Sequence, residues 1–303
     1  MPVFSFDAIG TRWEIETPRP LAADVHREVL DRIQRFDLTY SRFRANSLVS
    51  RIAAAENGGR FEFPADAVGL FGLYDRFAAA TSGAVDPLVG RDLELLGYDS
   101  GYSLVPAAPA VWQRERARGR ARWTADVIRD GTTLITRRPV VIDVGAVGKG
   151  YLVDLVSEIL RSAGVDSFVV DAGGDLRHAG DSGIRVGLEH PTETGLVAGV
   201  AELRNHALCA SAVNRRAWGP GLHHVVDGRT GLPVDEVIAT WVLADEAAIA
   251  DGLATALFFT GAVRLAESFE FAHARMFADG RAEMSAGFDG ELFVAEAIEQ
   301  ERK

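Results

Sequence analysis

Residues 140–175 constrain the fold of this chain more than any other stretch. A short apolar run at residues 140–142 predicts a buried strand, which delivers Asp143 into a glycine-rich loop. Apolar residues then recur at helical spacing over residues 152–160, and a second apolar run at residues 168–170 predicts another buried strand. The pattern is therefore strand, glycine loop, helix, strand, with acidic residues after both strands.

The loop contains Gly145, Gly148 and Gly150. Glycine lets backbone N–H groups approach an anion closely, and the following helix N-terminus carries a partial positive charge that favours phosphate. We therefore expect a nucleotide-type ligand. The spacing matches neither the G-x-G-x-x-G dinucleotide fingerprint nor the G-x-x-x-x-G-K-[ST] phosphate loop. A glycine-rich turn required only by backbone geometry stays open as the alternative.

Further elements follow from apolar periodicity. We expect an opening pair of strands, a first amphipathic helix, a short helix begun by Ser47, and a longer helix opened by Pro64. Strands and a final helix are expected in the C-terminal half. The ranges are 3–6 and 11–17 for the strand pair, 21–36, 47–52 and 64–80 for the helices, 184–188, 197–203, 207–211 and 238–244 for the later strands, and 247–259 for the last helix.

The length of 303 residues suits one large domain, and we expect a single domain over residues 1–303. An arginine-rich tract at residues 106–123 marks a soft internal boundary and predicts a solvated helix and linker. The formal charge of -11 weighs against binding to nucleic acid or to an anionic membrane. The same charge favours a metal counter-ion wherever acidic side chains meet phosphates.

Cys209 is the only cysteine, so an intrachain disulfide or a cysteine metal cluster is excluded, and its apolar neighbours predict a buried residue. The residues after Met1 do not resemble a signal peptide, and no apolar run reaches the roughly 18 residues that span a bilayer. We therefore expect a cytoplasmic protein without a membrane span. Lys149, in the glycine loop, is the only lysine apart from the terminal Lys303.

Two further places in the C-terminal half carry candidate chemistry. His224 precedes the strong turn signal Asp227-Gly228. A histidine at such a place is more often structural than catalytic, but an adjacent acid and the second histidine, His223, strengthen the case for a functional role. Asp251 and Thr255 are four residues apart, so they share a face of the predicted last helix. Two oxygen ligands at that spacing can reach one hard cation such as Mg²⁺. A helix-terminal aspartate with an incidental threonine is the alternative.

Taken together, a series of short motifs resembles the ApbE family of FAD:protein FMN transferases, in the order in which that family carries them. Each motif alone is weak, and the resemblance covers nearly the whole chain. The motifs are Gly10-Thr11, Ser41-Arg-Phe43, Gly83-Ala-Val-Asp-Pro87, Asp143-Val-Gly-Ala-Val-Gly-Lys-Gly-Tyr151, Gly173-Gly-Asp175, His224-Val-Val-Asp-Gly-Arg-Thr-Gly231 and Asp251-Gly-Leu-Ala-Thr255.

The resemblance implies an α+β fold related to the T-fold, with a mainly antiparallel sheet and packed helices. It implies FAD bound in a cleft with Mg²⁺, and transfer of FMN from FAD to a threonine hydroxyl of an acceptor flavoprotein, with release of AMP. Two alternatives remain. One is a pyrophosphatase that hydrolyses FAD to FMN and AMP, and the other is a protein that holds FAD without turnover.

The resemblance also implies residue roles. Asp251 and Thr255 would bind the metal through side-chain oxygens, with Ala146 and Ala254 contributing backbone carbonyls. His224 would deprotonate the acceptor hydroxyl or orient the pyrophosphate, with Asp227 holding its ring. The positions that would contact FAD are Ile9, Phe43, Ala84, Val85, Asp86, Asp143, Lys149 and Val225.

Overall fold

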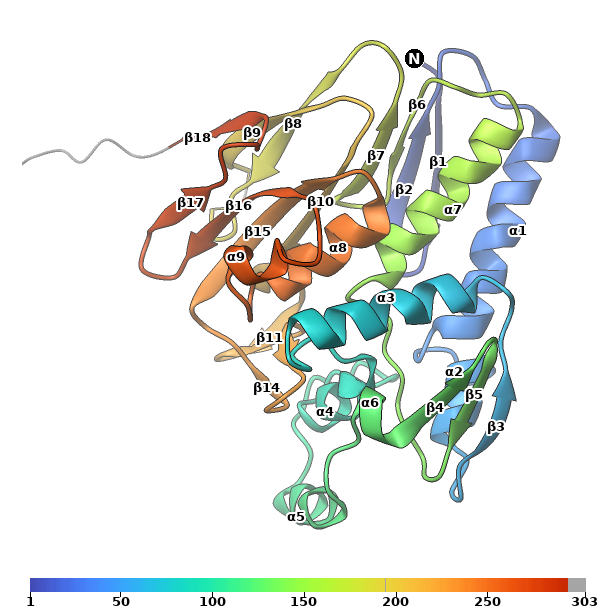
Figure 1. Ribbon diagram of the computed structural model, residues 1–303, viewed down its shortest axis with the longest axis vertical. Helices are drawn as coiled ribbons and strands as arrows, with labels where there is room; N and C mark the ends of the chain where they lie inside the picture. The colour runs from blue at the N-terminus through green and yellow to red at the C-terminus, as the bar shows by residue number, and fades with distance from the viewer. Residues whose placement is uncertain (194, 294–303) are drawn as a thin grey trace, which may run out of the picture.

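An eight-stranded sheet lies at the centre of the computed structural model, which describes residues 1–193 and 195–293 (Figure 1). The strand order is β1-β2-β6-β7-β10-β15-β16-β17, and all neighbouring strands are antiparallel. This arrangement confirms the expected α+β class. The strands are β1 (Val3–Ala8), β2 (Thr11–Glu16), β6 (Phe168–Asp171), β7 (Asp175–Ala179), β10 (Ala207–Ala212), β15 (Val237–Ala244), β16 (Ala272–Phe277) and β17 (Ala282–Met284).

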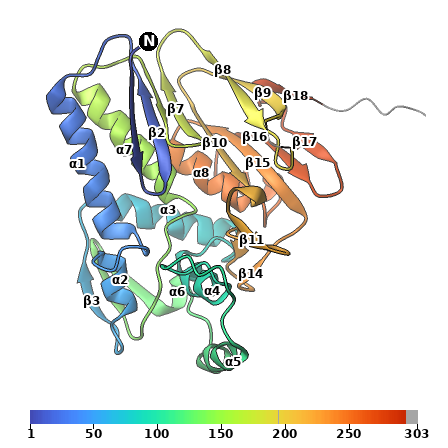
Figure 2. The ribbon, with the colours of Figure 1, turned by 180° about the vertical axis from the view of Figure 1, so that it is seen from behind.

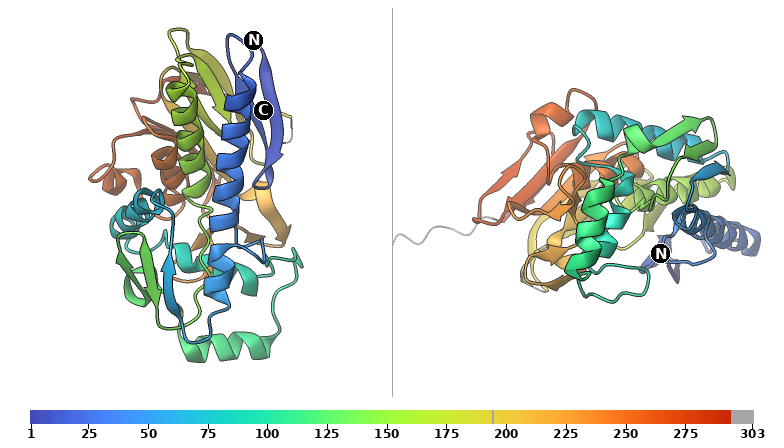
Figure 3. Two further views of the ribbon diagram at one scale, coloured as in Figure 1. Left: turned by 90° about the vertical axis from the view of Figure 1, so that its right-hand side faces the viewer. Right: turned by 90° about the horizontal axis from the view of Figure 1, so that it is seen from below.

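Three helices cover one face of this sheet. Helices α7 (Gly148–Ser162) and α8 (Ala247–Ala256) contact each other, and α1 (Ala23–Tyr40) runs beside α7, as Figure 3 shows. A three-stranded sheet of β8 (Ile184–Glu189), β9 (Val197–Leu203) and β18 (Gly290–Leu292) lies over part of the other face (Figure 2). The central strands therefore have apolar neighbours on both faces.

Strands β10 and β15 contribute side chains to the apolar clusters on both faces of the sheet. Side chains alternate between the faces of a strand with a period of two. Accordingly, Cys209 and Val242 belong to the apolar cluster that includes α7 and α8, whereas Leu208, Trp241 and Leu243 belong to the cluster shared with β8 and β9. The predicted burial of Cys209 is confirmed.

The remaining elements are short and lie mostly around the end of the sheet where the glycine loop enters. Helix α3 (Ala67–Ala80) crosses beside α8 (Figure 1). The other elements are α2 (Leu48–Ala53), α4 (Gly90–Leu95), α5 (Pro109–Arg118), α6 (Trp123–Asp126), α9 (Ala262–Leu265), the 3₁₀ turns η1 (Pro87–Val89) and η2 (Val213–Arg216), and the strands β3 (Gly59–Glu62), β4 (Val127–Asp130), β5 (Thr133–Thr136), β11 (Ala217–Gly219), β12 (Leu222–His223), β13 (Val226–Asp227), β14 (Leu232–Pro233) and β18 (Gly290–Leu292).

Helices α7 and α8 approach each other most closely at Gly150. A Cβ atom there would lie 2.2 Å from the carbonyl oxygen of Ala247, so only glycine fits without a shift of the backbone. Beyond this contact the Asp154 carboxylate of α7 accepts hydrogen bonds from the amides of Ala247 and Ala248, at 3.0 and 2.8 Å. These amides have no partner within their own helix, so α7 caps the N-terminus of α8.

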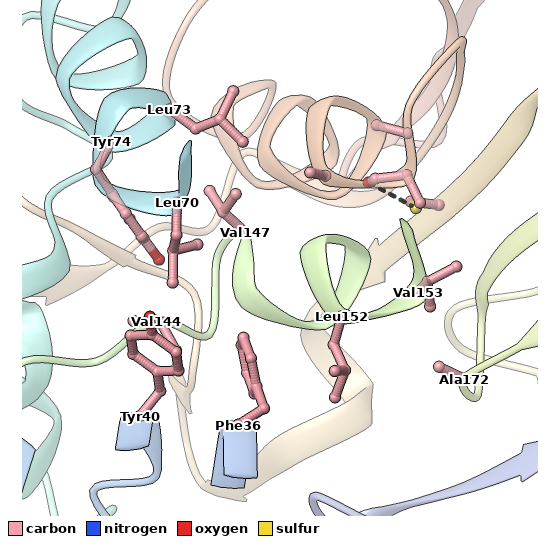
Figure 4. Close-up of a cluster of buried hydrophobic side chains, with 14 of the residues drawn as sticks. Phe36, Tyr40, Leu70, Leu73, Tyr74, Val144, Val147, Leu152, Val153 and Ala172 are labelled. Atoms are coloured by element: carbon pink, nitrogen blue, oxygen red, sulfur yellow. Dashed lines mark hydrogen bonds between the residues drawn. The ribbon is translucent and has the colours of Figure 1, made fainter. Parts of the chain in front are cut away.

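Figure 4 shows the buried side chains around the loop that precedes α7. Phe36 and Tyr40 of α1, Leu70 of α3, and Val144 and Val147 of the loop lie in one apolar cluster. All of them are nine-tenths or more buried. The loop is therefore anchored by apolar contacts on both sides of Gly145.

The strand expected at residues 140–142 is not present. Val140 and Ile142 are buried as expected, but these residues form no strand ladder, and the backbone runs on to Asp143, whose amide donates to the carbonyl of Pro87 at 2.7 Å. Burial in a passage between other elements produces the same apolar run as a strand. The second predicted strand is confirmed as β6.

The tract at residues 106–123 contains α5, which has no buried residue and projects from the molecule in Figure 1, so the expected solvated helix is confirmed. The other expected strands and helices are present with shifted ends. Across the residues that the structure describes, no helix combines the length and the apolar character needed to cross a membrane.

Candidate functional site

A cavity of about 610 Å³ joins segments that are far apart in the sequence. Its wall includes the tip of the β1–β2 hairpin, the end of α1, the glycine loop, the end of β10 and one face of α8. Figure 2 shows the hairpin tip reaching toward the middle of the molecule. The predicted site residues that line the cavity are Ile9, Phe43, Ala84, Val85, Asp86, Asp143, Ala146, Lys149, His224, Val225, Asp251 and Thr255.

The two oxygen-bearing residues of α8 lie in this cavity beside the start of α7. Asp251 is buried, and its Oδ2 accepts a hydrogen bond of 2.9 Å from the amide of Gly150. Thr255, one helical turn further on, lines the same cavity, as does Ala146 in the glycine loop. Asp251, Thr255 and the glycine loop therefore meet at one corner of the cavity, which we call the cation corner.

This corner suits a hard cation. Burial raises the pKa of Asp251 well above its ordinary value, and the nearby Asp175 carboxylate raises it further. A bound cation would offset this negative charge. Among the described residues there is no group of three or more His, Cys, Asp and Glu side chains able to hold a metal. A cation here would therefore take hydroxyl, carbonyl and substrate oxygens besides Asp251, which is a set that Mg²⁺ uses.

Ala254 departs from the expected metal set. It does not line the cavity, and its carbonyl oxygen accepts a hydrogen bond of 2.7 Å from the hydroxyl of Thr240 in β15. The i, i+4 spacing places the side chains of Asp251 and Thr255 on one face but does not fix the direction of the Ala254 carbonyl, which faces Thr240. The structure thus favours Ala146 over Ala254 as a backbone ligand.

Asp143 forms a buried ion pair that the sequence did not reveal. Its Oδ2 lies 2.5 Å from Nε of Arg42, and its Oδ1 accepts from the amide of Gly145 at 2.7 Å. Burial alone would raise the pKa of Asp143, but the charge and hydrogen bond of Arg42 outweigh burial and lower it. Arg42 also donates to the carbonyl of Tyr98 at 2.8 Å. Asp143 is therefore held as a carboxylate at the cavity wall.

Aromatic side chains form the part of the cavity next to the Arg42–Asp143 pair, which we call the aromatic wall. The Phe43 and Tyr102 rings stack with centroids 5.0 Å apart and planes 12° apart, and the Arg42 guanidinium lies 4.2 Å from the Phe43 centroid. Tyr98 stacks on Trp218 at 5.3 Å. Such a surface suits a flat ring, since aromatic groups and guanidinium planes both stack favourably.

The hairpin tip carries backbone strain at the cavity. Ile9 has φ 44° and Gly10 has φ 78°, so both residues of the two-residue turn are in the left-handed region. This region is rare for a β-branched residue. The tip is also packed tightly, because a Cβ at Gly173 would lie 2.0 Å from the Thr11 hydroxyl.

Ala84, Val85 and Asp86 form a buried edge of the cavity. The Asp86 carboxylate accepts from the amides of Leu88 and Trp123, at 2.8 and 3.0 Å, and burial raises its pKa. Its hydrogen bonds therefore fix the local turn, as its place before a proline suggested.

His224 faces the cavity from the segment between β12 and β13. Its Nδ1 atom is buried and has no hydrogen-bond partner among the described residues. Burial, with the neighbouring charge of Arg216, lowers the pKa of His224 to about 4. The ring is therefore neutral at pH 7. His223, by contrast, contacts the Val234 carbonyl at 2.7 Å through Nε2, which is a structural role.

Asp227 does not hold the His224 ring, so that expectation is corrected. Its carboxylate accepts from the backbone amide and the side chain of Arg229, at 2.7 and 3.0 Å, and the residue does not line the cavity. The next residue, Gly228, donates from its amide to the Ala84 carbonyl at 2.7 Å, which ties this turn to the cavity edge.

Arg216 is a second cavity residue that sequence reasoning missed. Its backbone carbonyl accepts from the His224 amide at 3.2 Å, and its guanidinium contacts the Tyr98 hydroxyl. A Cβ at Gly10 would lie 3.5 Å from its Nη2 atom, so the side chain also reaches the hairpin tip. No predicted motif contains Arg216, and Arg42, although it lies within the Ser41-Arg-Phe43 motif, was given no role, because the partners of both residues are distant in sequence.

Known proteins resemble this chain in family, sequence and structure. A model described as the ApbE family matches residues 9–276. A Rhodobacter capsulatus protein named FAD:protein FMN transferase is 29% identical over 267 residues, which are 85% of this chain and 51% of the relative. A Haemophilus influenzae protein of the same name is 29% identical over 238 residues, covering 74% and 66%. The chain thus spans about half of one relative and under two thirds of the other.

Solved structures agree on the fold. The flavin transferase ApbE from Vibrio cholerae and the ApbE protein from Thermotoga maritima each superpose with a TM-score of 0.81 at 24% identity. Each alignment covers 94% of this chain and 97% of the other. The expected ApbE-type architecture is confirmed.

Proposed function

Since the chain belongs to the ApbE family, we propose that it transfers the FMN moiety of FAD to a threonine hydroxyl of an acceptor protein and releases AMP. The proposal depends on one observation above all: the Asp251–Thr255 pair and the glycine loop line the same cavity. Such a transfer requires a cation and a diphosphate to meet, since alignment and charge neutralisation dominate phosphoryl chemistry.

In the proposed reaction the threonine oxygen attacks the phosphorus of the FMN half. The bond from that phosphorus to the bridging oxygen breaks, AMP leaves with the bridging oxygen and its electron pair, and the threonine proton moves to a base. Mg²⁺ held by Asp251, Thr255 and the Ala146 carbonyl would supply neutralising charge at the diphosphate.

His224 is the proposed base, because its unpartnered Nδ1 is buried at the cavity wall and its ring is neutral at pH 7. A pKa of about 4 makes a weak base. Since the positive charge of Arg216 contributes to that low value, an incoming diphosphate that pairs with Arg216 would raise it. Substrate binding would thereby activate the base.

The proposed FAD contacts divide by chemistry. Lys149 and Arg216 offer cations to the diphosphate, while Phe43 with Tyr102 offers an aromatic surface to a ring. The Asp143 carboxylate, fixed by Arg42, can accept a hydrogen bond from a ring N–H. Ile9, Ala84, Asp86 and Val225 would supply the remaining walls.

Incubation with FAD, Mg²⁺ and an acceptor protein carrying a modifiable threonine, followed by mass spectrometry, tests the proposal. A covalent FMN adduct on threonine with an equal amount of AMP supports transfer. Free FMN and AMP without adduct would support hydrolysis, and retained intact FAD would support a binding protein. Either of these two outcomes contradicts the proposed transfer.

A further inference from the structure

Asp175, the first residue of β7, is a fully buried carboxylate to which nothing above assigns a role. It has 0% exposure, and neither carboxylate oxygen accepts a well-directed hydrogen bond from the described residues. The ammonium of Lys149 lies 3.1 Å from its Oδ2 atom. This ion pair is therefore the main compensation for a buried negative charge.

A charge in such a place is costly unless it is paired. Removing a carboxylate from water costs several kcal/mol, and only a close, well-placed cation offsets that cost. The residue opposite Asp175 in the β7–β10 pair is Cys209, whose thiol donates to the Ala247 carbonyl at 3.4 Å. A carboxylate facing this small, weakly polar side chain depends on Lys149.

Lys149 itself points to what the pair does. It is in the first turn of α7, and its side chain lines the cavity, 28% exposed. A free lysine side chain samples many rotamers, because its four-carbon stem is flexible. The Asp175 pair confines the ammonium to the cavity wall, beside the helix N-terminus and within the influence of the Asp251 charge.

We propose that Asp175 is a positioning residue whose ion pair holds the Lys149 ammonium where it contacts the phosphates of a dinucleotide diphosphate. The identity of the ligand rests on the proposed function, while the ion pair rests on the structure alone. Asp175 touches no substrate and acts only through Lys149. The pair presents a cation at a fixed point of the wall and adds to the helix N-terminus as an anion site.

A double-mutant cycle tests this role through binding alone. The variants are Asp175→Asn, Lys149→Met and the double variant, and the probe is Mg²⁺-ADP measured by calorimetry. Asp175→Asn should weaken ADP binding by about tenfold, because the ammonium is no longer confined. The same change should have no further effect in the Lys149→Met background, because the group through which it acts is gone.

Thermal stability provides a second readout with a definite sign. Lys149→Met leaves a buried carboxylate without a cation, so it should lower Tm more than Asp175→Asn does. The double variant removes both charges and should melt above Lys149→Met. If Lys149→Met is too unstable for calorimetry, the order of the three Tm values still tests the ion pair.

Leu176→Ala is the matched control, because Leu176 follows Asp175 in β7 but packs in the apolar cluster on the other face of the sheet, and it should leave ADP affinity unchanged. An equal loss of affinity from Asp175→Asn in both backgrounds would overturn the proposal and make Asp175 purely structural. If the double-mutant cycle shows that Asp175 and Lys149 are coupled in ADP binding, but the protein makes no FMN adduct, the proposed function is refuted and the role of Asp175 stands.

Discussion

The cation corner and the aromatic wall line one cavity, and they differ in how their residues are held. At the corner, Asp251, Thr255 and the glycine loop are fixed by helix backbone and by the close α7–α8 approach at Gly150. At the wall, Arg42, Phe43, Tyr98, Tyr102 and Arg216 are held by side-chain stacking and ion pairs between distant segments. We therefore expect the corner to set the chemistry and the wall to set the affinity.

The largest expected effect is at the corner. Asp251→Ala should abolish Mg²⁺-dependent transfer, because it removes the only carboxylate of the proposed metal set. The fold should survive, since a buried carboxylate with a raised pKa contributes little to stability at pH 7. Transfer rates across a Mg²⁺ titration, with Tm as the control for folding, check this prediction. Turnover equal to that of the unchanged protein would remove Asp251 from the metal site.

The next effect is at the proposed base. His224→Ala should reduce the transfer rate by about a hundredfold or more, the usual range for loss of a general base, and leave FAD affinity within about threefold. Single-turnover rates and FAD titration measure the two quantities separately. His223→Gln is the matched neighbour and should affect Tm rather than transfer. If His224→Ala weakens FAD binding as much as it slows transfer, the histidine is structural.

Arg216 of the aromatic wall also contacts the proposed base, since its carbonyl accepts from the His224 amide. Its loss should therefore have an intermediate effect. Arg216→Met should weaken FAD binding by about tenfold, the size of one lost charge-assisted hydrogen bond. It should also raise the pKa of His224, because the positive neighbour that helps to lower it is removed. Transfer requires neutral His224, so the acid limb of kcat/KM should move to higher pH. A weaker affinity with an unmoved acid limb would show that Arg216 does not act on His224.

The smallest effect is expected at the aromatic wall. Tyr102→Ala should weaken FAD binding by only about threefold to tenfold, which corresponds to one stacking contact of roughly 0.5–1.5 kcal/mol. The transfer rate at saturating FAD should not change. Tyr102→Phe keeps the ring and serves as the control. A large fall in the saturated rate would contradict the division of labour between corner and wall.

The difference between the cation corner and the aromatic wall also explains which site residues could be predicted from the sequence. Asp251 and Thr255 were predictable because the i, i+4 spacing on one helix carries its own geometry, and the glycine loop was predictable because helix entry and close approach are local properties. The ion pair of Arg42 with Asp143 could not be predicted, since the two residues are 101 positions apart and no local pattern records the pair.

The predictions were wrong where one apolar or turn pattern is compatible with two different local structures. Val140 and Ile142 are buried as a strand would be, yet they lie in an irregular passage. Asp227 lies within the histidine motif, yet its carboxylate accepts hydrogen bonds from Arg229 rather than from His224. Burial and proximity in sequence were visible, whereas the direction of a side chain and its hydrogen-bond partner required the fold.

The central claim is that one cavity brings a divalent cation and the FAD diphosphate into contact. Replacement of Mg²⁺ by Mn²⁺, followed by electron–nuclear double resonance on the complex with FAD, measures this contact directly. We predict a phosphorus-31 hyperfine coupling to Mn²⁺ that disappears in Asp251→Ala. A Mn²⁺ ion bound in the presence of saturating FAD without any phosphorus coupling would contradict the claim.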